Sequence, residues 1–190
     1  VALAEARGRA LARDVLAPID LPNFDNSAVD GYAVRHGDLN ARSETRLVIA
    51  DRVTAGRAAS QPLQAGQAIR IFTGAPMPQG ADTVFMQEDV RIEGGAVIVP
   101  AGLKHGANRR LAGEDVKSGS VALPAGRMLS IADIALASAL GLTELPVRRR
   151  IRVALFSTGD ELVEPGKPLR GASLYDANRR LLTGLIASLG

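Results

Sequence analysis

The sequence contains no cysteine and no tryptophan, and only six of its 190 residues are aromatic, four Phe and two Tyr. The lack of cysteine excludes thiol catalysis, thiolate metal sites and disulfide bonds, and it is compatible with the cytoplasmic location that we expect. The scarcity of aromatics argues against a surface that stacks single-stranded nucleic acid bases. No apolar run approaches the roughly 18 residues of a membrane span. The core must therefore consist mainly of aliphatic side chains.

The charges of the chain nearly cancel. Lys and Arg number 23 against 20 Asp and Glu, which gives a formal net charge of +3. So small a surplus does not indicate a surface for duplex DNA or RNA, and we expect neither a nucleic-acid nor a membrane partner. A hydrophobic fraction of 46% excludes a disordered chain.

The first two-thirds of the chain change character twice. Apolar residues at helical spacing predict a helix over residues 2–16, which Pro18 and Pro22 follow. From about residue 22 to 127, Gly and Pro separate short runs with strand character, which predict one antiparallel, barrel-like or sandwich-like unit. These runs are RLVIADRV (46–53), QAIRIFT (67–73), DTVFMQE (82–88) and VRIEGGAVIV (90–99), the last a hairpin that turns at Gly94-Gly95.

Helical character returns in SIADIALASALG at residues 130–141. Ser130 is placed to cap the first turn, Asp133 stands where the acid of a capping box belongs, and Gly141 suits the position after the last turn. The two helical segments are either unrelated, or they are parts of one helical region into which the β-rich unit is inserted.

The last segment reads as the opening of a βαβ unit. IRVALFST (151–158) has the composition of a buried strand, a loop with Gly and acids follows, and a helix is predicted from about residue 176 to the end. A parallel strand needs neighbouring strands and covering helices, which about 40 residues rarely supply. We therefore expect the 190 residues to be a fragment of a longer protein.

Two polar segments of the middle region are candidates for chemistry. In LPNFDNSAVDGYAVR (21–35), two carboxylates beside an amide and a hydroxyl either form Asx turns or hold Mg²⁺ and orient a substrate hydroxyl. In IFTGAPMPQGAD (71–82), Thr73 ends a strand before a loop stiffened by Gly and Pro. That loop is either a plain exit from the strand or a rigid binder of an anion through backbone N–H groups.

Two further polar segments follow. In NRRLAGEDVKSG (108–119), forked Arg donors suit phosphate or carboxylate and the Glu-Asp pair suits a metal, although a solvated charged turn has the same composition. FSTGDEL (156–162) stands after the predicted strand, where ligands gather in parallel sheets, and YDANRR (175–180) begins the next helix. We interpret His36 and His105 as surface residues without metal partners.

Taken together, the four segments are specific. In this order, FDNSAVDGYAVR, IFTGAPMPQGADTVFMQED, RRLAGEDVKSG and RVALFSTGDELVEPG with YDANR resemble the molybdopterin molybdenumtransferase family, which includes MoeA and the E domain of gephyrin. The resemblance covers essentially all 190 residues. The departures are mild: Val29 stands where Met is usual, Phe72 where Met is common, and Ala177 where Ser is common.

The resemblance implies an enzyme of molybdenum cofactor biosynthesis that inserts molybdate into adenylylated molybdopterin, releases AMP and uses Mg²⁺. It implies a homodimer and a MogA-type adenylyltransferase as pathway partner. The fold would be multidomain, α+β and α/β: a discontinuous helical domain I (1–21 and 119–147), an inserted β-rich domain II (22–118) and the truncated start of a MogA-like α/β domain III (148–190). A C-terminal β-barrel domain would be absent, and we expect the chain alone to be inactive.

The resemblance also assigns residues. The catalytic residues would be Asp30, Thr73, Asp115 and Glu161, and the metal ligands Asp160 and Glu161. The substrate-binding residues would be Asn26, Ser27, Thr158, Gly159, Asp176 and Asn178. Asp30, Thr73 and Asp115 would form a wall of the cleft that the partner subunit contributes. The alternatives are a non-catalytic dimerisation or scaffold module of the same fold and an RNA-binding β domain, the latter disfavoured by charge and aromatic content.

Overall fold

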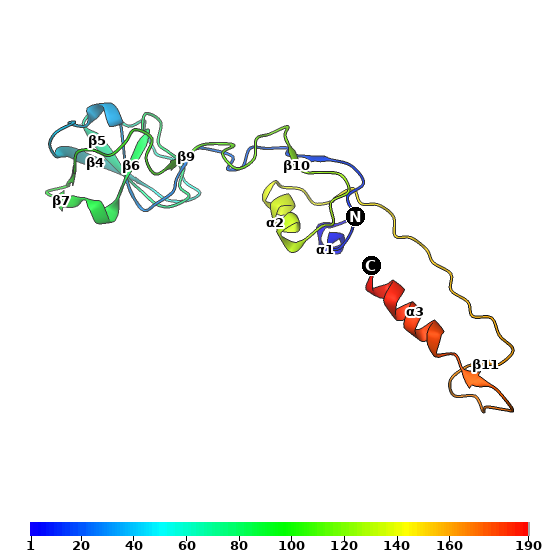
Figure 1. The fold of residues 1–190 in the computed structure, drawn as a ribbon. Helices are drawn as coiled ribbons and strands as arrows, with labels where there is room; N and C mark the ends of the chain where they lie inside the picture. Colours follow the sequence, from blue (N-terminus) through cyan, green and yellow to red (C-terminus); the bar gives the residue numbers. More distant parts are fainter. Residues whose placement is uncertain (190) are drawn as a thin grey trace. The chain divides into compact units, whose positions relative to one another are not determined.

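A computed structural model describes residues 1–189 of the chain, which fall into two compact units (Figure 1). The β unit consists of Leu16–Ala122. The discontinuous unit combines Val1–Val15 with the chain from Leu123 onward. The chain passes from one unit to the other after Val15 and after Ala122, a few residues from the boundaries expected after residues 21 and 118. The assignment of these parts to numbered domains stays a prediction.

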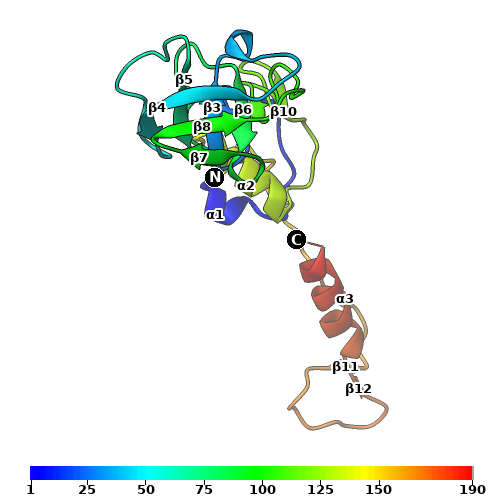
Figure 2. The same cartoon turned by 90° about the vertical axis from the view of Figure 1, so that its left-hand side faces the viewer.

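A six-stranded sheet forms the body of the β unit (Figure 2). Its strand order is β6-β3-β5-β4-β8-β7. The four predicted runs of strand character all contribute to it, and Gly94 and Gly95, both with positive φ, make the turn of the predicted hairpin. The sequence did not predict β3. The strands are β3 (Gly31–Val34), β4 (Thr45–Val53), β5 (Gln67–Ile71), β6 (Thr83–Met86), β7 (Arg91–Glu93) and β8 (Ala96–Val99).

The prediction of a wholly antiparallel unit is wrong at one pair of strands. β4 and β5 run parallel, with Val48 beside Gln67 and Val53 beside Ile71. Parallel neighbours need a crossover of about a dozen residues or more, and the connection 54–66 is long enough to return along the sheet. The tight Gly-Gly turn enforces an antiparallel pair, whereas this longer connection leaves the direction open.

Both faces of the sheet are covered by clusters of mostly aliphatic side chains. Side chains alternate along β3, so that Tyr32 and Val34 face one cluster and Ala33 the other. The first cluster also contains Leu47, Ala68, Phe85, Val97 and Val99, and the second contains Val53, Leu63, Ile69, Ile71, Ala75 and Val84. Phe85 is the largest fully buried side chain, which confirms a core with few aromatics.

Shorter elements complete the β unit. The 3-10 turns η1 (His36–Asp38) and η2 (Gln87–Asp89) follow β3 and β6. β2 (Asn26–Ser27) pairs antiparallel with β9 (Arg109–Arg110), which joins two of the polar segments. β1 (Val15–Leu16) and β10 (Val121–Leu123) form a further two-stranded sheet where the chain changes unit.

The discontinuous unit contains less helix than the sequence predicts. α1 spans only Leu3–Ala6. Gly8 has a φ of +71°, which turns the chain, and Ala10 and Leu11 then form bridges with Met128 and Val147 instead of continuing the helix. The prediction of a helix over 2–16 is therefore wrong beyond its first turn.

The second helix is as predicted. α2 spans Ile131–Ala139, with the capping box of Ser130 and Asp133 formed and Gly141 at a φ of +77°. Ala137 of this helix packs with Ala6, Leu11 and residues from the returning chain, so the segments before and after the β unit share one core. The other members of that core are Val15, Leu123, Leu129 and Leu145.

The end of the chain holds β11 (Leu162–Val163), β12 (Leu174–Tyr175), which is parallel to β11, and α3 (Ala177–Ser188). α3 confirms the predicted helix, but the predicted buried strand 151–158 is wrong. No strand within residues 1–189 pairs with this segment, and Ile151 and Phe156 are 89% and 81% exposed. A strand needs backbone partners, so its apolar composition alone does not form one.

No helix of the described chain has the length and apolar character needed to cross a membrane.

Candidate functional site

Asp30 and Thr73 meet at one end of the six-stranded sheet. Gly31 on β3 faces Ile71 on β5, so the residues just beyond this pair come together. An oxygen of the Asp30 carboxylate accepts hydrogen bonds from the backbone N–H of Thr73 at 2.8 Å and from its hydroxyl at 2.9 Å. The family resemblance assigned both residues to the site although they lie 43 residues apart in the sequence, and in the structure they are in direct contact.

These hydrogen bonds keep Asp30 ionised. The backbone N–H of Thr73, then its hydroxyl and the charge of Arg70, hold the pKa of the Asp30 carboxyl below its ordinary value. An ionised carboxylate only accepts hydrogen bonds. Asp30 is therefore suited to orient a donor group of a ligand and unsuited to give up a proton near neutral pH.

Gly31 is needed because β3 lies close to β6 at this point. A Cβ atom at residue 31 would lie 1.8 Å from the carbonyl oxygen of Phe85. The backbone N–H of Gln87, just after β6, donates to the carbonyl of Asp30 at 3.0 Å. The backbone of Asp30 is thus fixed on both sides, by β5 and by the end of β6.

Two arginines that the sequence did not single out stand on β4 and β5 near this end of the sheet, and the charge of one of them, Arg70, acts on Asp30. Arg70 donates to the carbonyl of Gly31 at 2.9 Å and to the side chain of Gln87. Its guanidinium carbon lies 4.6 Å from the centre of the Phe72 ring, and that of Arg52 lies 4.8 Å from the same ring. The available signal was an arginine within each of two strand runs rich in aliphatic residues, RLVIADRV and QAIRIFT.

Three of the four polar segments converge in the β unit. The backbone of Ser27 exchanges hydrogen bonds with the loop after Thr73, accepting from Gly74 at 2.8 Å and donating to Ala75 at 3.0 Å. Ser27 also stands opposite Arg109, in the register of β2 and β9. The segments around residues 26, 73 and 110 are therefore held together by backbone pairing.

Within these segments, several predicted side chains make local contacts. The buried Ser27 hydroxyl donates to the carbonyl of Val29 at 2.6 Å, and the buried Asn26 amide donates to the carbonyl of Phe24 at 3.2 Å. Asp115 accepts from Arg110 at 2.6 Å. These contacts are those of turns and a charged loop, and the binding and catalytic roles of Asn26, Ser27 and Asp115 stay predictions.

Asp25 links the first and third segments. Its carboxylate accepts from the backbone N–H of Ala112 at 2.8 Å and forms an ion pair with Arg109. The Ala112 hydrogen bond, with Arg109, outweighs partial burial and lowers the pKa of the Asp25 carboxyl. The Arg109 guanidinium is therefore engaged in an ion pair within the β unit.

The fourth segment belongs to the discontinuous unit. The Glu161 side chain folds back over Gly159, where a Cβ atom would lie 2.6 Å from both carboxylate oxygens. Asp176 caps α3 by accepting from the backbone N–H of Arg179 at 3.0 Å, and it is 7% exposed. Thr158, Asp160 and Asn178 are exposed. An open cavity of about 250 Å³ lies among Ser157, Gly159, Val163, Asp176 and Arg179.

The carboxylates offer a limited donor set for a metal. Within residues 1–189, no group of three or more His, Asp or Glu side chains is placed to hold a metal ion. Asp160 and Glu161 are adjacent, exposed carboxylates. Mg²⁺ is often bound by one or two carboxylates together with substrate phosphates, so this pair fits the ion predicted from the sequence as a partial set of ligands.

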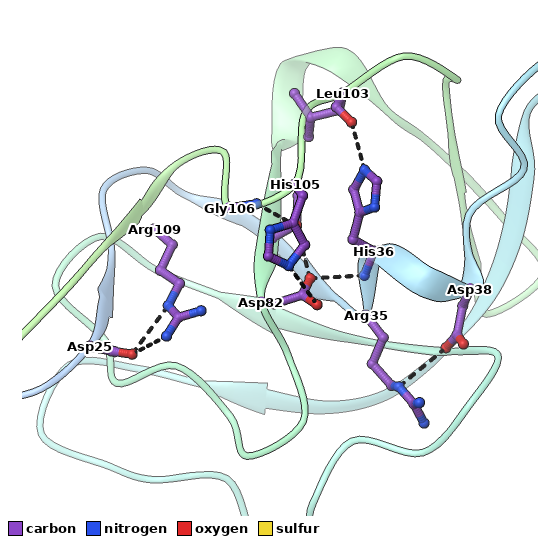
Figure 3. A network of polar contacts seen from close by, with 10 residues as sticks. Asp25, Arg35, His36, Asp38, Asp82, Leu103, His105, Gly106 and Arg109 are labelled. Carbon is purple, nitrogen blue, oxygen red and sulfur yellow. Dashed lines mark hydrogen bonds and ion pairs between the residues drawn. The ribbon is translucent and has the colours of Figure 1, made fainter.

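Of the two histidines expected at the surface, His105 is exposed and His36 is half-buried, and both take part in a polar network (Figure 3). The half-buried His36 ring bonds the carbonyl of Leu103 at 3.0 Å, and the exposed His105 ring lies 3.3 Å from the carboxylate of Asp82. Burial acts to raise the pKa of Asp82, but hydrogen bonds from the His36 backbone and from Thr83 outweigh it and lower the pKa. The network attaches the loop before β9 to the start of β6.

Comparison with known proteins places the chain. A family model described as the MoeA N-terminal region (domain I and II) matches residues 1–141. The molybdopterin molybdenumtransferase of Haemophilus influenzae is 42% identical over 98% of this chain and 46% of its own length. That of a Nostoc species is 43% identical over 97% of this chain and 43% of its own length.

Solved structures of MoeA proteins also resemble this chain. A crystal structure of the molybdopterin biosynthesis MoeA protein from Pyrococcus horikoshii OT3 has a TM-score of 0.91 at 39% identity, over 98% of this chain and 51% of that one. The chain thus spans about half the length of the curated relatives it matches. Because a family model matches about three-quarters of its length and relatives exceed 40% identity, the chain belongs to the MoeA N-terminal family.

Proposed function

We propose that this chain is part of a molybdopterin molybdenumtransferase, which inserts molybdate into adenylylated molybdopterin and releases AMP. The observation that carries the proposal is the contact between Asp30 and Thr73, at 2.8 and 2.9 Å, in a member of this family. Relatives named for this activity at 42% and 43% identity support it.

In this proposal Asp30 orients the substrate. Its ionised carboxylate, fixed by Thr73, accepts a hydrogen bond from a hydroxyl or N–H group of the ligand. Thr73 acts on Asp30, because both its backbone N–H and its hydroxyl are directed at that carboxylate. Fixing the acceptor before the substrate arrives reduces the ordering cost of binding.

The Mg²⁺ ion predicted from the sequence would be held by Glu161 and Asp160. When bound, such an ion neutralises negative charge on substrate phosphates. Thr158 and Gly159 would contribute a hydroxyl and backbone N–H groups to the same phosphates. Gly159 has no side chain, which leaves room for the Glu161 carboxylate directly over it.

The larger assembly is also part of the proposal. The chain would supply domain I (1–21 and 119–147), domain II (22–118) and the start of a MogA-like domain III (148–190) of a homodimer that works with a MogA-type adenylyltransferase. Shared backbone pairing and one core between the segments before and after the β unit support a discontinuous first domain. The wall with Asp30, Thr73 and Asp115 would face a site on the partner subunit.

The test is molybdate-dependent release of AMP from adenylylated molybdopterin by the intact enzyme. Asp30→Asn keeps the shape of the side chain but removes its charge, and we expect AMP release to fall by about 100-fold. Glu161→Gln should have a similar effect. The matched control is Asp89→Asn, because Asp89 is exposed and makes no side-chain hydrogen bond or ion pair in the described chain.

Circular dichroism of each variant separates loss of chemistry from loss of fold. Full turnover in both Asp30→Asn and Glu161→Gln would contradict the proposed site. A homodimer that binds neither molybdopterin nor molybdate would instead favour the scaffold alternative.

A further inference from the structure

Two arginines stand directly opposite each other on neighbouring strands. Arg52 on β4 and Arg70 on β5 are partners in the parallel register. Facing like charges on adjacent strands destabilise a sheet. Tyr32 on β3 is the partner of Arg70, and Phe85 on β6 is the partner of Tyr32. Directly paired residues lie on the same face of a sheet, so both arginines lie on the face that carries the cluster with Phe85.

One aromatic ring supports both guanidinium groups. The guanidinium carbons of Arg52 and Arg70 lie 4.8 and 4.6 Å from the centre of the Phe72 ring, and that of Arg70 lies 5.1 Å from the Tyr32 ring. Contacts within about 6 Å of a ring are attractive. They also reduce the freedom of two long side chains, which lowers the cost of ordering them when a ligand binds.

The positive charge of this pair is only partly compensated. Arg70 bonds two uncharged groups, the Gly31 carbonyl and the Gln87 side chain. Within residues 1–189, Arg52 forms no ion pair and its side chain donates no hydrogen bond. The carboxylate that acts on Arg70 is Asp30, which Thr73 already engages. The two guanidinium groups outnumber the one carboxylate that acts on them, and Glu88 lies one side chain further away, where it accepts from the Gln87 amide at 2.9 Å.

We propose that Arg52 and Arg70, supported by Phe72, bind a tetrahedral oxyanion beside Asp30 and Thr73. Arg52 is the direct ligand, because its forked N–H donors are free and exposed and match the oxygens of such an anion. Arg70 adds charge and positions the pair through its bond to Gly31. The anion would offset the repulsion between the facing arginines.

The chemical identity of the anion rests on the proposed function. A phosphate group of the nucleotide-bearing substrate and molybdate itself are both tetrahedral oxyanions, and the site would take either by the same charge and geometry. The anion site, however, is inferred from residues of the β unit alone and can be tested without turnover.

The experiment titrates the 190-residue chain separately with inorganic phosphate and with molybdate at constant ionic strength, followed by calorimetry or by amide chemical shifts. Arg52→Gln should weaken binding of the anion by about tenfold, and Arg52→Lys should weaken it less because the charge remains. The matched control is Arg42→Gln, an exposed arginine just before the opposite end of β4, which should bind like the unaltered chain.

The outcomes are distinct. Saturable binding of phosphate, of molybdate or of both that is weakened only by the Arg52 variants supports the site, and the preferred anion identifies its source. Equal binding by Arg52→Gln and Arg42→Gln, or no saturable binding by the unaltered chain, overturns it. If Asp30→Asn abolishes AMP release while Arg52→Gln binds anions normally, this inference fails alone. If anion binding depends on Arg52 but the intact enzyme releases no AMP, the proposed function fails and the anion site stands.

Discussion

Replacement of Gly31 by Ala tests whether the close approach of β3 and β6 holds the site in place. The added Cβ would lie 1.8 Å from the carbonyl oxygen of Phe85, whereas real Cβ atoms essentially never come within 3.0 Å of another atom. The obstacle is backbone, so no side-chain rotation relieves it. The two strands must separate by at least about 1.2 Å, which lengthens a hydrogen bond of about 2.9 Å beyond 4 Å.

The cost follows from what that movement breaks. One or two hydrogen bonds between β3 and β6 would be lost, at about 0.5–1.5 kcal/mol each, and the packing of the buried Val84 and Phe85 would loosen. We therefore expect the free energy of unfolding to fall by about 2–4 kcal/mol. Asp30 is bonded to the neighbouring peptide, so its contact with Thr73 should weaken as well.

Urea unfolding followed by circular dichroism of the sheet measures the effect as a lower midpoint at unchanged slope. Gly37→Ala is the matched control, because a Cβ there meets nothing within 4 Å and the residue has an ordinary φ. The control should change the free energy of unfolding by less than about 0.5 kcal/mol. If Gly31→Ala unfolds at the same midpoint as Gly37→Ala, the argument from close approach is wrong.

Two further predictions concern the discontinuous unit. A Cβ at Gly184, inside α3, meets nothing within 4 Å, so Gly184→Ala should stabilise the helix by about 0.5–1 kcal/mol and slow hydrogen exchange of its amides about two- to five-fold; unchanged exchange would contradict this. Burial acts to raise the pKa of Asp133, but hydrogen bonds from Ser130 and Arg127 lower it below the ordinary 3.8. The stability that the ionised carboxyl contributes is therefore present above about pH 4 and is lost as the pH falls through the lowered pKa. The difference in free energy of unfolding between the unaltered chain and Asp133→Asn should be constant near neutral pH and shrink below pH 4 in urea titrations, and a difference that grows in acid would refute the sign.

Features that depend on neighbouring residues were predictable from the sequence. The Gly94-Gly95 hairpin and the capping box at Ser130 need only a few adjacent residues, and both form. The aliphatic core also follows from composition and alternation. The helix over 2–16 fails because Gly8 turns the chain and the residues after it find partners more than 100 residues away.

Features that depend on pairing across the chain were not predictable in this way. Strand β3 lies inside a segment whose polar residues suggested turns, and the parallel direction of β4 and β5 follows from a long connection. Arg52 and Arg70 are 18 positions apart, and only the register of two strands places them opposite each other. The motif resemblance identified Asp30 and Thr73 because it compares individual residues. It could not identify Arg52 and Arg70, because only the pairing of β4 with β5 brings these two arginines together.

The interleaving of the two units has a consequence for synthesis. The N-terminal residues pair with residues that are made much later: Val1 bonds the carbonyl of Leu145, and Leu3 bonds that of Thr143. At about 5–20 residues per second, a ribosome needs roughly 7–29 s to make the 140 or so residues that separate these partners. The first residues must therefore wait on the nascent chain while the β unit emerges whole. The two ends of that unit come together at Ala17 and Ser120, 2.9 Å apart from N to O, so its folding delivers the waiting segment to its partners.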